Sequence, residues 1–192
     1  SAQSKSYGST APTSGTLNTN FTVSGLQGSD AASGATLSYS GTPAGNTATA
    51  AVGSYTITPS ALTLSSGSTS NYSITYSTGT LTVNAAALTI TGISISNKVY
   101  NGNTTATITG TAAYSGLVNG ETFTVTGTPS ASFADANVGT AKAVTVTGYT
   151  APSANYSITQ PTGLTANITA ASLTVTASAQ SKSYGSTAPT SG

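Results

Sequence analysis

The stretch SAQSKSYGSTAPTSG stands at residues 1–15 and again, without one substitution, at residues 178–192. The two copies are therefore 178 − 1 = 177 residues apart. Self-similarity at a fixed spacing is the sequence signature of a tandem-repeat architecture. A catalytic domain has no reason to restart at its own C-terminus. We therefore interpret the chain as one full repeat followed by the beginning of a second.

Low charge is the main feature of the composition. Charged residues make up 4% of the chain and hydrophobic residues 36%, whereas about a quarter of an average protein is charged. Serine and threonine together exceed a third of the residues. The net charge of +1, carried by scattered lysines, provides no basic surface for phosphates, which argues against nucleic acid as a partner. Disordered segments combine low hydrophobicity with high net charge, so we expect this chain to fold.

The sequence contains no cysteine and no apolar run of 18 residues. A disulfide framework is therefore excluded, and we expect no membrane insertion in this segment. The lack of cysteine is compatible with a protein exported by a bacterium, whose stability cannot depend on oxidation.

Short runs with apolar residues at every second position follow one another along the chain. Such alternation places one face of a strand on a core and leaves the other in water, so we predict small antiparallel sheets. Clusters of Gly, Pro and Ser, among them Pro59 and the group 65–70, are expected to separate the strands. The predicted strands are residues 35–40, 54–58, 71–76, 79–83, 88–95, 105–109, 121–127, 142–148, 155–159, 164–169 and 172–177.

Two local features interrupt this pattern. The alternation changes phase at Gly92, which predicts a bulge or bend within the strand 88–95. The only helical element that we expect is a single turn around residues 26–32.

Internal motifs divide the repeat into two related, unequal modules. NYSIT occurs at 71–75 and 155–159, and Lys5 and Tyr7 recur as Lys98 and Tyr100. We therefore predict three segments: a first module, a second module, and the start of the next repeat copy, with a short joint between the modules. Their ranges are 1–86, 87–171 and 172–192, and the joint is 84–87.

The first module lacks a counterpart of the strand that precedes the Lys/Tyr motif in the second module. An unpaired sheet edge is costly or adhesive. Residues matching 172–177 of a preceding copy would supply that strand. Two arrangements can achieve this: a longer covalent array, which we favour, or separate protomers that lend the strand to one another.

The motifs of both modules resemble those of known repeats. KVYNGNTTATITG at 98–110, with FADANVGTAKAVTVTG at 133–148, resembles the YDG-type repeat of very large bacterial surface proteins, although Asn101 stands where that pattern carries Asp. KSYGSTAP at 5–12, with NYSITYSTGTLTV at 71–83, resembles the companion MBG repeat of the YGX type. The resemblance implies a predominantly β extracellular module, strung in tandem in secreted adhesins similar to filamentous haemagglutinins.

The inventory of reactive groups argues against an enzyme. The sequence has no His or Cys, and its three acids, Asp30, Glu121 and Asp135, are scattered. Acid–base catalysis needs a group that titrates near the working pH, and a metal site needs clustered ligands. We therefore predict no catalytic, cofactor-binding or metal-binding residues and no cofactor.

Several single residues have possible roles beyond the fold itself. An isopeptide bond between Lys98 or Lys142 and a nearby Asn, assisted by Glu121 or Asp135, is one alternative to a purely structural role. Asp135 is otherwise expected to accept backbone N–H bonds in a turn. The sequence also contains N-x-S/T sites, which are glycan acceptors in some proteins: Asn20, Asn71, Asn103, Asn155 and Asn167.

Tyrosines recur at the motifs and at the joint. We expect their rings to pack in the core or between modules, with the hydroxyl reaching water or a carbonyl group; a sugar-stacking platform is the functional alternative. These residues are Tyr7, Tyr72, Tyr100, Tyr156 and Tyr184.

Together these features predict an all-β fold: an elongated tandem array of small antiparallel modules, either sandwich-like or β-grasp-like, with at most a short helical turn per module. The predicted function is a non-catalytic structural repeat in an extracellular stalk or fibre of a bacterial surface adhesin. Its partners would be neighbouring modules of the same chain or fibre, with other cells or surface glycans as further candidates. The alternatives are a module that binds carbohydrate or a host surface, and a protomer of a strand-exchanged extracellular filament.

Overall fold

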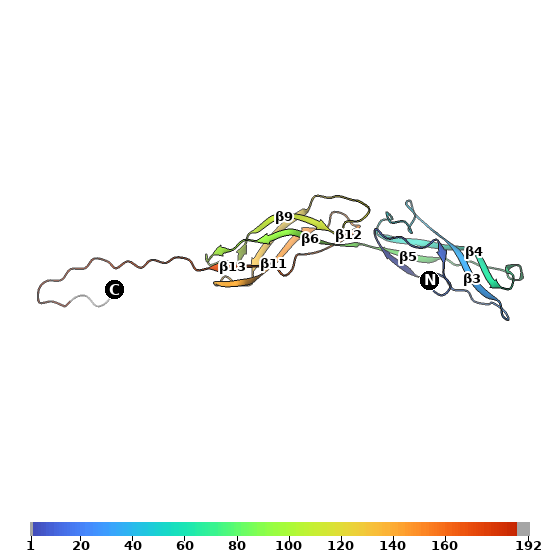
Figure 1. Ribbon diagram of the computed structural model, residues 1–192, viewed down its shortest axis with the longest axis horizontal. Coiled ribbons are helices and arrows are strands. Elements are labelled where there is room, and N and C mark those ends of the chain that lie inside the picture. Colours follow the sequence, from blue (N-terminus) through green and yellow to red (C-terminus); the bar gives the residue numbers. More distant parts are fainter. Residues whose placement is uncertain (1, 188–192) are drawn as a thin grey trace.

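The computed structural model describes residues 2–187 and consists almost entirely of strands. Figure 1 shows two modules that lie one after the other along the longest axis. The predicted all-β fold is confirmed. The first module contains β1 (Gln3–Ser6), β2 (Ser14–Gly15), β3 (Ala31–Tyr39), β4 (Gly53–Ser66), the 3-10 turn η1 (Thr69–Asn71) and β5 (Gly79–Asn84). The second contains β6 (Ala86–Ile95), β7 (Lys98–Val99), β8 (Thr105–Ala106), β9 (Ile108–Ser115), β10 (Thr126–Phe133), β11 (Gly139–Thr150), β12 (Tyr156–Thr159) and β13 (Thr165–Thr169).

The first module is built on one five-stranded sheet in the order β1-β5-β4-β3-β2. Its alternating sequences produce one buried face, on which Leu37, Leu81 and Val83 are almost inaccessible to water. Lys5 and Tyr7 lie on this same face, because side chains two residues apart in a strand point to the same side of the sheet. Two segments without regular pairing, residues 22–27 and 73–78, cover part of the sheet in place of a second one.

The second module is a two-sheet sandwich. A five-stranded sheet, β7-β13-β11-β10-β8, faces a three-stranded sheet, β12-β6-β9. Ile90 from the smaller sheet packs in one cluster with Phe133, Val146 and Ile168 from the larger sheet. Burial of aliphatic and aromatic side chains between the sheets stabilises this module.

Three of the strand pairs are parallel, unlike the antiparallel sheets that we predicted. These pairs are β1–β5, β12–β6 and β13–β7. Each joins strands that are separated by a long stretch of chain, so that no hairpin forces the antiparallel direction. Alternation alone defines which face of a strand is buried and does not define its direction.

The bulge predicted at Gly92 is confirmed. The register between β6 and β9 shifts between Thr91 and Ile93, and Gly92 has a φ angle of 79°. A Cβ atom at this position would collide with the carbonyl oxygen of Thr111. Only glycine combines this backbone conformation with such a close approach.

The helical turn predicted at residues 26–32 is wrong. Gly28 and Ser29 form a reverse turn, in which the N–H of Asp30 donates to the carbonyl of Gln27, and β3 begins at Ala31. Gly, Ser and Asp are turn-forming residues, and this property outweighs the weak apolar spacing around Leu26.

Four predicted strands are wrong in whole or in part. The predicted strand 105–109 is interrupted at Thr107 and divides between β8 and β9. Residues 73–76 have no strand pairing, β10 begins only at Thr126, and residues 172–177 form no strand. Each of these runs alternates, but alternation produces a strand only where a neighbour supplies the hydrogen bonds. Residues 188–192, the end of the second repeat copy, lie outside the described residues.

Pro59 does not separate two strands as predicted, because it lies inside β4 opposite Leu37. The pairing of β4 with β5 ends at Ile57 and Gly79. The missing N–H of Pro59 therefore leaves no hydrogen bond to β5 unmade. No helix among residues 2–187 is long and apolar enough to cross a membrane.

Candidate functional site

The two modules are connected by one residue. Ala85 alone lies between the last residue of β5, Asn84, and the first residue of β6, Ala86. The module cores are continuous across this joint, since Ala86, Leu88 and Tyr156 of the second module belong to one hydrophobic cluster with Tyr7 and other residues of the first. The short joint and the shared core leave the modules little freedom to move against each other.

A carboxylate between two tyrosines forms the polar centre of this junction. Glu121 accepts a hydrogen bond from the hydroxyl of Tyr7 through Oε1 and another from the hydroxyl of Tyr156 through Oε2, the latter at 2.6 Å. The tyrosine rings meet edge to face with centroids 5.5 Å apart. The backbone N–H of Val118 donates to the Tyr156 hydroxyl at 3.2 Å. We call Tyr7, Glu121, Tyr156 and Val118 the tyrosine–glutamate junction.

The junction stabilises the neutral form of both phenols. The hydrogen bond to Glu121, followed by burial, raises the pKa of Tyr7 above its usual value of 10.0. Burial, followed by the hydrogen bond to Glu121, raises the pKa of Tyr156 in the same way. Both hydroxyls therefore remain donors at any physiological pH, and a negative carboxylate can be held between them.

Two further hydrogen bonds join the modules outside this centre. The N–H of Val52 donates to Oδ1 of Asn155 at 3.0 Å, and Nδ2 of Asn119 donates to the carbonyl of Ala48 at 3.2 Å. The contacts thus come from several loops of both modules. Such an arrangement fixes their relative orientation better than a single contact could.

The Lys/Tyr motif has the same local role in each module. Lys5 is buried, with 8% of its surface exposed, and its Nζ donates to the carbonyls of Ser9 at 3.0 Å and Thr47 at 2.7 Å. Burial lowers the pKa of Lys5. Lys98 donates in a similar way to the carbonyls of Asn103 at 2.7 Å and Thr105 at 3.1 Å. Each ammonium group thus donates hydrogen bonds to backbone carbonyls of the neighbouring loops and stabilises those loops.

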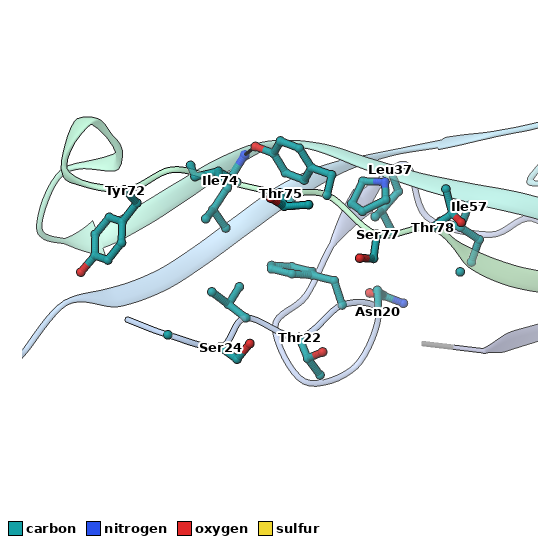
Figure 2. A pocket seen from close by; sticks show the side chains of 18 of the residues that line it. Asn20, Thr22, Ser24, Leu37, Ile57, Tyr72, Ile74, Thr75, Ser77 and Thr78 are labelled. Carbon is teal, nitrogen blue, oxygen red and sulfur yellow. Dashed lines mark hydrogen bonds between the residues drawn. The ribbon is translucent and has the colours of Figure 1, made fainter. Parts of the chain in front are cut away.

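A cavity of about 380 Å³ lies on the buried face of the first sheet. One wall is formed by residues 20–26 and the opposite wall by residues 72–79, with Leu37 and Ile57 of the sheet between them. Figure 2 shows Thr22 and Ser24 on the first wall and Ile74 and Thr75 on the second. We call this cavity the first-module groove.

A second tyrosine–carboxylate contact lies at the end of the first-module groove. The hydroxyl of Tyr72 donates to Oδ2 of Asp30 at 2.6 Å and accepts from the N–H of Gln27 at 3.1 Å. The hydrogen bond to Asp30 raises the pKa of Tyr72. Among the described residues, no second hydroxyl donates to Asp30.

Each of the three acids in the sequence has a polar partner. Asp30 and Glu121 bind tyrosine hydroxyls, while Asp135 lies 2.6 Å from Nζ of Lys142. This lysine lowers the pKa of Asp135, to which the N–H of Asn137 also donates, as expected for a turn. In residues 2–187, no three His, Cys, Asp or Glu side chains are grouped closely enough to hold a metal ion.

Each candidate lysine for an isopeptide bond contacts only one of the two partners that the bond needs, an Asn for Lys98 and an acid for Lys142. Lys98 donates to Oδ1 of Asn103 at 2.9 Å, but no hydrogen bond or ion pair in the described part of the chain joins Lys98 to Glu121 or Asp135. Lys142 has the acid Asp135 as its hydrogen-bond partner.

At four of the N-x-S/T sites, the asparagine side chain accepts a hydrogen bond from a backbone N–H through Oδ1. These are Asn20, Asn103, Asn155 and Asn167.

The recurring tyrosines fall into two groups. Tyr7 and Tyr156 are buried at the tyrosine–glutamate junction, as the packing interpretation predicts, although their hydroxyls reach a carboxylate rather than a carbonyl. Tyr100 and Tyr184 are exposed. Tyr72 is half-buried beside the first-module groove.

Sequence reasoning missed the roles of Asp30 and Glu121, although a signal was present. Each acid lies five residues after a glycine in a similar stretch, GLQGSD at 25–30 and GLVNGE at 116–121. Each stretch is followed, farther along the chain, by NYSIT. Matching these two stretches would have paired each acid with the tyrosine of the NYSIT motif.

Comparison with protein families divides the chain at the same joint. Residues 1–82 match the model of the MBG domain (YGX type), and residues 84–163 match the model of the YDG domain. Both are tandem-repeat domains found in large bacterial surface proteins. No curated protein and no solved structure matches the chain significantly. Residues 1–82 therefore belong to the MBG family of the YGX type, and residues 84–163, which follow directly, belong to the YDG family.

Proposed function

We propose that this chain is a structural repeat of an extracellular stalk or fibre in a bacterial surface adhesin, without catalytic activity. Membership in two families of surface-protein repeats supports the location outside the cell. The 15-residue duplication at a fixed spacing supports an array of many copies. The function is mechanical: each copy adds a constant length and holds the next one in a defined orientation.

The junction between the two domains is the observation that carries this proposal. A one-residue joint, a shared hydrophobic cluster and the tyrosine–glutamate junction resist bending in several directions at once. Flexible linkers are built differently, since they are long and rich in Gly and Ser and make no contacts. The partners of such a module are its neighbours in the chain, and a ligand-binding unit would belong elsewhere in the array.

The roles of the acids support a non-catalytic function. All three carboxylates are bound to tyrosine or lysine side chains that serve as structural partners. The sequence also has no His or Cys that could act as a base or nucleophile.

The mass of the native polypeptide, together with electron microscopy of the undenatured material, tests this function. A boiled, denatured chain of many hundreds of kilodaltons, and thin surface fibres with an axial repeat of two domains, would support a covalent stalk. A single 18.6 kDa band from fibrous material would instead support strand exchange between protomers. Globular particles confined to the cell interior would contradict the proposal.

A further inference from the structure

The stalk requires a junction between successive copies of the repeat, and the inference drawn here rests on that proposed function. We propose that residues 171–177 form a strand in the first-module groove of the copy that directly follows them in a tandem chain. Tyr100 of the preceding copy then donates a hydrogen bond to Asp30 of that following copy. The copy-to-copy junction would thus repeat the tyrosine–glutamate junction already present between the two domains.

The YDG domain contains the same groove with its strand in place. β6 lies between β12, to which it is parallel, and β9, to which it is antiparallel. Leu88 of β6 lies opposite Ile158 of β12, and Ile90 lies opposite Tyr114 of β9. Leu88 is fully buried by these neighbours.

The MBG domain has both neighbours of this strand but not the strand itself. The segment NYSIT at 71–75 is identical to residues 155–159, which contain β12. The segment TVSGL at 22–26 matches AYSGL at 113–117, which contains the end of β9. These two segments form the walls of the first-module groove, and no strand of the described residues runs between them.

The polar end of the groove is also duplicated. Tyr72 binds Asp30 and the N–H of Gln27, just as Tyr156 binds Glu121 and the N–H of Val118. In the YDG domain the second carboxylate oxygen of Glu121 accepts from Tyr7 of the preceding domain. No described residue of the MBG domain supplies the corresponding second donor to Asp30.

Residues 171–177 have the sequence of the missing strand. ITAASLTVT at 168–176 matches VNAAALTIT at 83–91, the end of β5 and most of β6. Leu173 and Val175 correspond to the inward-facing Leu88 and Ile90, yet each has 89% of its surface exposed. Two large aliphatic side chains in strand alternation, both in water, are expected to be buried by a neighbour.

The residues before this segment make the same strand pairing and the same backbone hydrogen bond as the residues before β6. Ile168 of β13 pairs with Lys98, as Val83 of β5 pairs with Lys5. The N–H of Tyr100 donates to the carbonyl of Thr169 at 2.8 Å, and the N–H of Tyr7 donates to the carbonyl of Asn84 at the same distance. Tyr100 therefore corresponds to Tyr7, and it remains 45% exposed.

The equivalence predicts the register of the new strand. If the new strand has the register of β6 in the YDG domain, Leu173 lies opposite Ile74 and Val175 lies opposite Val23. Val23 and Ile74 are half-buried on the two walls of the groove. Figure 1 shows the C-terminal segment leaving the YDG domain at the end away from the MBG domain, so the occupant of the groove is a neighbouring copy.

An extended chain tests this register directly. A copy of residues 170–177 is placed ahead of residue 1, which reproduces the sequence at a tandem junction. In this extended chain, Val23→Cys is combined with a cysteine at the position of the extension that corresponds to Val175. Because the native sequence has no cysteine, only the introduced thiols can react. We expect a disulfide within one chain under mild oxidation, formed at least about tenfold faster than in the control, since directly opposed residues in antiparallel strands have the required separation.

The control places the second cysteine at the counterpart of Thr174, whose side chain points to the opposite face of the strand. Equal rates for the two pairs, or no disulfide with either, would overturn the proposal. Hydrogen exchange provides a measurement without cysteines: the extension is expected to slow exchange of the amides in 22–24 and 72–75 at least about tenfold. An extension with Leu173 and Val175 replaced by Asp should not slow it.

The outcomes separate this inference from the proposed function. Long native fibres without the predicted disulfide would be consistent with the proposed stalk function but would refute the placement of residues 171–177 in the first-module groove. Disulfide-linked oligomers of the extended chain, formed in place of the disulfide within one chain, would show that separate copies exchange the strand, which would overturn the placement within a tandem chain. Protection of the groove by added oligosaccharide, but not by the extension, would identify a sugar site and contradict the inference.

Discussion

The hydroxyl of Tyr7 donates a hydrogen bond to the carboxylate of Glu121, a residue 114 positions farther along the chain. Tyr7 belongs to the MBG domain and Glu121 to the YDG domain. In a chain with only three acids, one of them thus joins two domains, which makes this contact the most direct place to perturb their docking.

Replacement of Glu121 by alanine is expected to destabilise the protein by about 2–4 kcal/mol. The substitution leaves the buried hydroxyls of Tyr7 and Tyr156 without their acceptor, and hydrogen bonds to charged groups are worth about 1.5–3 kcal/mol each. Denaturant unfolding monitored by tyrosine fluorescence measures the change. The matched control is Asp135→Ala, which removes an exposed acid and its ion pair with Lys142 and is expected to shift the unfolding midpoint much less, because exposed ion pairs contribute little. Equal effects of the two substitutions would contradict the role assigned to Glu121.

High pH is expected to weaken the tyrosine–glutamate junction. Folding raises the pKa of Tyr7 and Tyr156 above 10.0, so their contribution to stability is complete below pH 10 and declines as the pH rises through the higher folded-state values. The difference in unfolding free energy between the wild type and Tyr7→Phe, Tyr156→Phe should therefore stay constant below pH 10 and shrink as the pH rises above it. A difference that stays constant above this pH as well would show that the two hydroxyls do not titrate with folding.

Alanine at Gly92 is expected to cost roughly 3 kcal/mol or more. The new Cβ atom would strain a backbone with φ of 79° and would also collide with the carbonyl of Thr111. Gly102 has a φ of 77° with no atom within 4 Å of such a Cβ, so Gly102→Ala isolates the backbone strain and should cost only about 1 kcal/mol. Thermal unfolding of both variants checks this prediction, and similar losses would mean that the β6–β9 bulge can relax.

Methionine in place of Lys5 is expected to cost about 2 kcal/mol, because the carbonyls of Ser9 and Thr47 lose their donor while the apolar stem keeps its packing. Lys98→Met should cost less, since the carbonyls of Asn103 and Thr105 lie on exposed residues where water can replace the ammonium group. Denaturant unfolding of the two variants provides the comparison. A larger loss at Lys98 would contradict this reasoning.

Much of the fold follows from local sequence patterns. Alternation located β3, β5, β6 and β11, and the phase change at Gly92 located the bulge. Alternation failed at residues 73–76 and 172–177, where the sequence of a strand is present but its hydrogen-bonding neighbour is not. Strand direction and the contact between Tyr7 and Glu121 depend on long-range packing, which no short pattern encodes.

The length of chains that contain one, two and three covalently joined repeats is the most direct test that docked domains form a stiff stalk. Small-angle X-ray scattering provides the maximum dimension of each. A stalk with the same docked junction throughout predicts equal increments, one for each added repeat. Dimensions that grow only as the square root of the repeat number would show flexibly linked domains and would contradict the account.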